Sequence, residues 1–216
     1  MGTLPWKVIK YIFKMWSKKV TEREKQLEKN IVEYSINTIE EQKKQIGIIL
    51  EQKQKLIVKD VLWTFNELFQ KAINSLNDDE GKKVAYIVIS FLNTGILNNS
   101  IELKIDLYDN NIHFDKTPIT GYYEFHFFDD IIKKDISDFK NYIERKMIRV
   151  RYQELYHYRK VCMIKYKSLM EECMQVYVDL IIKLKSFLSM NKTPDFKIVY
   201  GELMCKNTIL YENVED

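Results

Sequence analysis

Glycine, proline, cysteine and arginine are all scarce in this chain of 216 residues. Six Gly and three Pro leave few positions that break helices or form tight turns, which favours long uninterrupted elements. Three Cys, an odd number with no framework spacing, exclude a disulfide-rich secreted scaffold and favour a reducing, cytoplasmic location. The 5 Arg stand against 29 Lys, a bias that we attribute to an AT-rich genome, such as that of a low-GC bacterium or its mobile elements.

Long apolar runs and the common catalytic motifs are missing as well. No stretch reaches the roughly 18 apolar residues of a membrane-spanning helix. The chain has no Gly-rich phosphate loop, no G-x-S-x-G elbow and no C-x-x-C pair, which are the usual signatures of nucleotide-binding, hydrolase and thiol-redox proteins. The net charge of +3 is too small to imply a polyanionic partner by itself.

Two long helical segments dominate the remaining pattern. The first runs over about 21–76 and opens at Thr21, whose spacing to Glu24 is that of a capping box. The second runs from about 137 to 190 without Gly or Pro. We expect these two segments to pack antiparallel as a coiled-coil-like hairpin. The nearly continuous apolar stretch 82–97 is either a buried strand or a buried third helix, and its length favours the helix.

Residues 1–20 predict a separate amphipathic helix ahead of a single domain over 21–216. Apolar residues recur at helical spacing on one side of this helix, and Lys residues lie on the other. The apolar stripe consists of Trp6, Ile9, Phe13 and Trp16. We expect the stripe to dock onto the body of the protein or onto a second subunit, and we favour this over contact with a membrane surface.

Residues 101–128 alternate between apolar and polar side chains, with two interruptions by turn residues. Such alternation is typical of half-buried antiparallel strands. We therefore predict a three-stranded meander with strands over about 101–108, 112–115 and 124–127. A similar alternation over 196–211 predicts a C-terminal hairpin. Together with the helices, these strands make α+β the expected fold class.

The polar face of this meander is where carboxylates and imidazoles concentrate. If both turns close symmetrically, Asp106 lies opposite His113 and Asp115 lies opposite Glu124, with their Cβ atoms about 5 Å apart. Imidazole nitrogens and carboxylate oxygens together suit a divalent metal, which is the one cofactor that we consider. The candidate metal ligands are His113, Asp115, Glu124 and His126.

The same face carries a second candidate chemistry, because Glu102-Leu103-Lys104 resembles the acid-x-Lys motif of metal-dependent nucleases. The carboxylates would hold the metal and Lys104 would stabilise the charge of the transition state. The candidate residues are Glu102, Lys104, Asp106 and Asp115. The Pro-Asp that usually precedes this motif is absent. The simpler interpretation, which we favour, is a strand face that contacts solvent or a partner.

Four of the five Arg fall within residues 145–160, where Tyr residues lie among them. Arg binds phosphates and carboxylates with two hydrogen bonds and stacks on aromatic rings, so the cluster is a candidate contact for nucleic acid or for an acidic protein. On one continuous helix, a single face would present Arg145, Arg149, Tyr152, Tyr156 and Arg159. The alternative that we favour pairs these Arg with acidic residues of the first long helix, namely Glu22, Glu24, Glu28 or Glu40.

Together these features predict a non-catalytic intracellular binding protein, a regulatory or neutralising partner of another macromolecule. We expect its partner to be another protein or a second copy of the chain, and we expect no cofactor. One alternative is a metal-dependent hydrolase or nuclease that uses the meander face. The other is a nucleic-acid-binding protein that uses residues 145–160.

Overall fold

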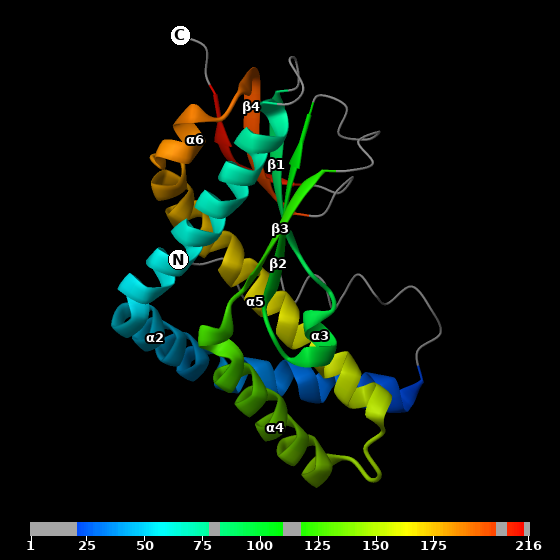
Figure 1. The fold of residues 1–216 in the computed structure, drawn as a ribbon. Helices are drawn as coiled ribbons and strands as arrows, with labels where there is room; N and C mark the ends of the chain where they lie inside the picture. Colours follow the sequence, from blue (N-terminus) through cyan, green and yellow to red (C-terminus); the bar gives the residue numbers. More distant parts are fainter. Residues whose placement is uncertain (1–20, 78–82, 110–117, 202–206, 214–216) are drawn as a thin grey trace. The chain divides into compact units, whose positions relative to one another are not determined.

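The structure is a computed structural model that describes residues 21–77, 83–109, 118–201 and 207–213. Long helices and a five-stranded mixed sheet make up the described fold (Figure 1). In chain order the elements are α2 (Glu22–Asn77), β1 (Val84–Phe91), α3 (Gly95–Asn98), β2 (Glu102–Tyr108), β3 (Ile119–Glu124), the 3₁₀ turn η1 (His126–Phe128), α4 (Asp129–Lys146), α5 (Tyr152–Ile181), α6 (Lys185–Ser189), β4 (Lys192–Tyr200) and β5 (Thr208–Glu212). The predicted helix over 1–20, with its Trp6–Trp16 stripe, lies outside the described residues. Within the described ranges, none of the helices has the length and apolar character needed to cross a membrane.

Helix α2 begins at the predicted capping box. The backbone N–H of Thr21 donates to the carboxylate of Glu24 (2.7 Å), and the backbone N–H of Glu24 donates to the hydroxyl oxygen of Thr21 (3.3 Å). These bonds satisfy two amides that the first turn of a helix leaves without an intrahelical partner. The helix then continues through Gly47 to Asn77 without a break, so the first long helix is confirmed.

The chain folds into two compact units, each assembled from segments that are far apart in the sequence. The first unit contains residues up to Gln52 together with Gly95–Ser100 and His126–Leu169. The second unit contains Lys53–Thr94, Ile101–Phe125 and the residues from Met170 onward.

In the first unit, α4 and the beginning of α5 pack beside the first part of α2 (Figure 1). Along α4, Asp135 contacts Gln42 and Lys146 contacts Glu33, so α4 runs antiparallel to α2. The core between the three helices is aromatic. The Phe139 ring stacks on the Tyr158 ring at a centroid distance of 3.7 Å, and the Tyr34 ring is T-shaped to both of them.

Helix α5 runs in the same direction as α2, because Arg23 contacts Glu154 while Gln42 contacts Lys165. The predicted antiparallel hairpin of two long helices is therefore wrong. The single helix expected from 137 to 190 is interrupted at Met147–Arg151, so that α4 takes the antiparallel position and the chain then turns back. A second, shorter interruption separates α5 from α6.

In the second unit, the sheet has the strand order β3-β2-β1-β4-β5. Strands β1 and β4 are parallel, and every other neighbouring pair is antiparallel. The remainder of α2 covers one face of this sheet: a Cβ on Gly121 of β3 would lie only 3.2 Å from Leu68. Helix α6 packs on α2 and β4 through the ring of Phe187, which lies 5.6 Å from the rings of both Phe69 and Phe196.

The apolar stretch 82–97 forms a strand rather than the third helix that we favoured. Strand β1 occupies Val84–Phe91 at the centre of the sheet, and Ala85, Ile87 and Ile89 are fully buried. A central strand is covered on both faces, so its sequence is continuously apolar and lacks the alternation of an exposed strand. The β-branched residues here favour this extended backbone.

The predicted meander is correct in part. Strand β2 lies where we placed it, but its neighbours are β1 and β3, and β3 spans Ile119–Glu124 instead of 124–127. The middle predicted strand, 112–115, falls in a range that the structure does not describe. The C-terminal hairpin is confirmed, since β4 pairs with β5 in antiparallel register.

Candidate interaction surface

The acidic face of the meander does not take the predicted register. Asp106 lies opposite Thr120 rather than opposite His113, and Glu124 lies opposite Glu102 rather than opposite Asp115. The reason is that Ile119–Glu124, which is β3, forms the pair with β2. His113 and Asp115 belong to 110–117 and are outside the described part of the chain.

Asp106 is buried and has three polar contacts within the second unit. The Thr120 hydroxyl donates to its carboxylate at 2.6 Å, Lys104 forms an ion pair with it at 2.9 Å, and the Tyr108 hydroxyl lies at 3.3 Å. His126 is instead on η1, where its ring nitrogen lies 3.6 Å from Asp129. Over the ranges that the structure describes, no group of three or more His, Cys, Asp or Glu side chains is arranged to hold a metal ion.

A buried polar cluster lies at the centre of the first unit, around Asp135. Its carboxylate accepts hydrogen bonds from Tyr158 (2.9 Å) and from the thiol of Cys162 (3.0 Å), and it forms an ion pair with Lys165 (3.3 Å). Gln42 of α2 and Tyr34 also donate to it. Asp135 joins α2, α4 and α5 at one point, and a buried carboxylate needs such partners.

The thiol in this cluster is not poised to react. Burial raises the pKa of the Cys162 thiol well above its usual value, and the nearby charge of Asp135 adds to this effect. Burial likewise raises the pKa of the Tyr158 hydroxyl. Both groups therefore remain protonated and act as hydrogen-bond donors, and the cluster serves to hold the helices together. The sequence signal for it is Asp135 itself, which occupies a core position in the stripe Ile132, Ile136 and Phe139.

The segment Met147–Arg151 between α4 and α5, which we call the clamped loop, is held in place by Arg23. The guanidinium of Arg23 donates to the backbone carbonyls of Ile148 (3.2 Å) and Arg149 (2.9 Å). The same group forms a two-point contact with Glu154, at 2.6 and 3.0 Å. Arg23 is the one Arg outside residues 145–160, and nothing in the sequence pattern around it indicates this role.

The electrostatics of this contact favour both charged forms. The hydrogen bond from Arg23 is the main reason that the pKa of Glu154 lies below its usual value, and the backbone N–H of Arg151 contributes to the same shift. The hydrogen bond to Glu154 raises the pKa of Arg23 in turn. The clamp is therefore fully formed at neutral pH, and it weakens only when acid protonates Glu154.

The clamped loop and the first turns of α5 expose an unusual set of side chains. Ile148 is 85% exposed and Tyr152 is 65% exposed. The rings of Tyr152 and Tyr156 are nearly parallel, with an interplanar angle of 13° and centroids 6.4 Å apart. The ammonium of Lys160 lies 4.7 Å from the centre of the Tyr156 ring. We call this set, with Arg149 and Arg151, the loop surface.

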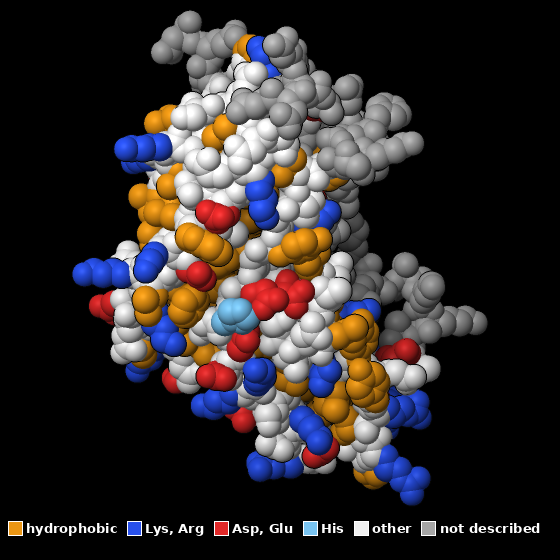
Figure 2. Space-filling view, viewed as in Figure 1, with side chains coloured by type: hydrophobic (Ala, Val, Ile, Leu, Met, Phe, Trp, Pro, Cys, Tyr) orange, Lys and Arg blue, Asp and Glu red, His pale blue; other side chains and the backbone are white. Residues whose placement is uncertain are grey.

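Apolar and basic side chains lie side by side over this part of the first unit, at the lower right of the space-filling view (Figure 2). Arg149 and Arg151 are exposed, and so is Arg145 in the last turn of α4. The predicted single face over 145–159 does not exist, because the loop separates Arg145 from the Tyr residues. Arg159 is only partly exposed, and its Nε atom is buried without a hydrogen-bond partner in the structure.

The acidic residues that we considered as partners for these Arg are engaged elsewhere. Glu22 contacts Lys25, Glu24 contacts Thr21, Glu28 contacts His157 and Glu40 contacts Lys43. Within the ranges that the structure describes, no ion pair is formed by Arg145 or Arg149. Their guanidinium groups are therefore available to a partner.

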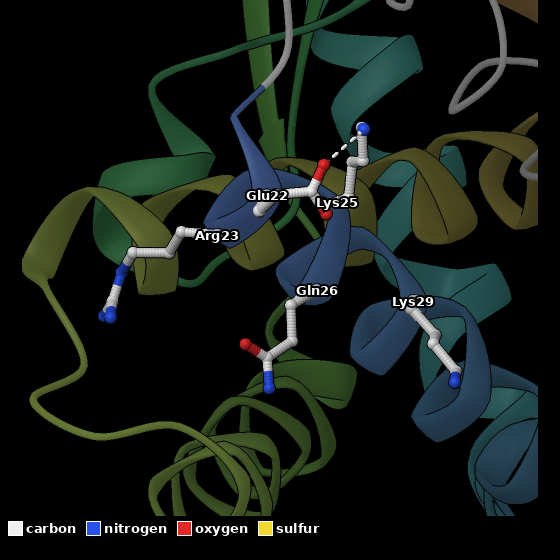
Figure 3. A pocket seen from close by; sticks show the side chains of 5 residues that line it. All are labelled: Glu22, Arg23, Lys25, Gln26 and Lys29. Carbon is white, nitrogen blue, oxygen red and sulfur yellow. Dashed lines mark hydrogen bonds and ion pairs between the residues drawn. The ribbon is translucent and has the colours of Figure 1, made fainter.

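A hollow of about 530 Å³ lies beside the clamp, along the first two turns of α2 (Figure 3). Its lining is Glu22, Arg23, Lys25, Gln26 and Lys29. Figure 3 shows Arg23 pointing toward the loop that leads into α5, while Gln26 points toward α4. Three of these five lining residues are basic and one is acidic, so the hollow is predominantly basic.

Comparisons with known proteins give no guide to this site, since no family model, no curated protein and no solved structure matches the chain.

Proposed function

We propose that the protein is a non-catalytic binding protein, a regulatory or neutralising partner of another macromolecule, and that its loop surface recognises an anionic region of that partner. The observation that supports this most directly is the clamp: Arg23 fixes the backbone of a loop in which the side chains of Ile148, Arg149 and Arg151 are exposed. A surface that is already ordered before binding loses less conformational entropy when it binds.

The charge of the surface favours an anionic partner. Residues 145–160 contain six Lys and Arg but one acidic residue, Glu154, and Arg23 already neutralises that carboxylate. Arg149 and Arg151 are exposed residues of the clamped loop, and within the described ranges neither side chain forms an ion pair. Such guanidinium groups bind carboxylates or phosphates in a bidentate manner.

A hydrolase or nuclease centred on Glu102, Lys104 and Asp106 is less well supported. The Asp106 carboxylate is buried against Thr120, Tyr108 and Lys104, so its oxygens are already occupied. A carboxylate that is to bind a catalytic metal needs lone pairs that face an open coordination site.

The proposal is tested with two fluorescent polyanions, a 20-residue Glu-rich peptide and a dT20 oligonucleotide, by fluorescence polarisation at low salt. The variant Arg149→Gln/Arg151→Gln should bind at least one of these probes about tenfold or more weakly than the wild type. The matched control is Lys55→Gln/Lys59→Gln, which removes two exposed charges from α2 and should bind as the wild type does. Equal weakening by both pairs, or no binding of either probe, would contradict the proposal.

A further inference from the structure

We infer that the partner at the loop surface is an acidic region of another protein, with an apolar pocket that receives Ile148. This inference rests on the proposed function, and it names the class of partner. It follows from the shape and chemistry of the exposed side chains of the loop surface.

Ile148 has the position of an anchor residue. It is 85% exposed, which is the largest exposed fraction among the large apolar side chains that the structure describes. The backbone carbonyl of the same residue is held by Arg23. Interfaces between proteins concentrate their binding energy in a few such residues, which fill pockets on the other partner. A branched aliphatic side chain has no flat face on which a nucleic-acid base could stack.

The aromatic residues nearby also fit a protein partner better than a single-stranded nucleic acid. Stacking of a nucleic-acid base needs an open ring face. The Tyr156 ring is instead stacked with the Tyr152 ring, and the Lys160 ammonium lies over it. Tyr152, at 65% exposed, is the more accessible ring of the pair. Tyr and Arg around an aliphatic anchor are the residue types enriched in protein interfaces.

Charge complementarity defines the rest of the partner. Arg149 and Arg151 follow the anchor within the clamped loop, and Lys25 and Lys29 line the hollow that includes Arg23. A matching surface would place Asp or Glu side chains around its apolar pocket, because like charges there would oppose binding. The partner that we infer is thus an acidic surface of another protein. Binding of a nucleic acid or of a second copy of this chain would contradict the inference.

The experiment uses the full chain as bait for phage-displayed random dodecapeptides. Enriched peptides are then synthesised and measured by fluorescence polarisation. We expect the enriched sequences to combine large apolar residues with several Asp or Glu. Their affinity should fall at least tenfold with Ile148→Asn and with Arg149→Gln. Val176→Asn, which alters an exposed apolar residue of the second unit, is the matched control and should leave binding unchanged. Circular dichroism melts of every variant verify that it is folded.

The possible results separate the inference from the proposed function. If the dT20 probe binds and is lost with Arg149→Gln but not with Ile148→Asn, the loop surface is a nucleic-acid site, and the inference fails while the proposed function stands. If the wild type sediments as a dimer and Ile148→Asn sediments as a monomer, the occupant is a second copy, and the inference also fails. If neither peptides nor oligonucleotide bind, both fail.

Discussion

Arg149 is the residue at which the clamped loop departs furthest from ordinary backbone geometry. Its φ of +53° lies in the left-handed region, which Gly adopts readily and which L-residues with a Cβ rarely adopt. The hydrogen bond from Arg23 to its carbonyl oxygen helps to hold it there. A strained residue that is exposed, charged and held by a dedicated contact is more informative about binding than about folding.

The variants Arg149→Gly and Arg149→Ala separate these two roles. Both lose the guanidinium, but Gly accepts the positive φ whereas Ala retains the strain. We expect Arg149→Gly to be more stable than Arg149→Ala by about 1 kcal/mol in the free energy of unfolding. Urea denaturation monitored by circular dichroism measures this difference. Equal stability of the two would show that the loop relaxes to negative φ when Arg149 is absent.

Among the elements, those governed by local chemistry could be predicted from the sequence. The start of α2 followed from Thr21 and Glu24, whose hydrogen bonds involve neighbouring residues alone. The hairpin of β4 and β5 followed from alternation of apolar and polar residues. Strand β1 could not be assigned in this way, because burial on both faces removes the alternation that distinguishes a strand from a buried helix.

The clamped loop was missed for a different physical reason. Residues 147–151 contain neither Gly nor Pro, so nothing local indicates a break in the helix. The contacts that stabilise the break come from Arg23, which is more than 120 residues away in the sequence. The clustering of Arg and Tyr residues can be read from the sequence, but the break in the helix that exposes Ile148 depends on this long-range contact.

The packing of α2, α4 and α5 depends on Asp135, and this gives a prediction at the scale of these elements. Asp135→Ala would leave the buried ammonium of Lys165 without its carboxylate, and we expect a loss of about 3–5 kcal/mol in the free energy of unfolding. Adding Lys165→Met should recover part of this loss, since no buried charge then remains. Denaturant titration of both variants measures the two free energies. Additive losses in the double variant would mean that the ion pair is not the reason for the destabilisation.

Over the whole molecule, the Lys and Arg side chains are distributed differently along the sequence. The 29 Lys are spread along the entire chain and are largely balanced by 31 acidic residues, so the net charge is only +3. The Arg, in contrast, are concentrated, with four of five in residues 145–160. A long-range field from the whole protein is therefore weak, and under the proposed function we expect the attraction of an anionic partner to come from the loop surface.

This distribution of charge predicts which residues of the loop surface control the association rate and which control the dissociation rate. Charges accelerate the encounter of two molecules, whereas buried anchors slow their separation. For an acidic peptide that binds the full chain, Arg149→Gln/Arg151→Gln should mainly lower the association rate, and raising NaCl from low to physiological concentration should reduce this difference. Ile148→Asn should mainly raise the dissociation rate, with little dependence on salt. Surface plasmon resonance across a salt series measures both rates. An association rate that falls equally for Lys55→Gln/Lys59→Gln would instead assign the attraction to net charge, because each double variant lowers the net charge by the same amount.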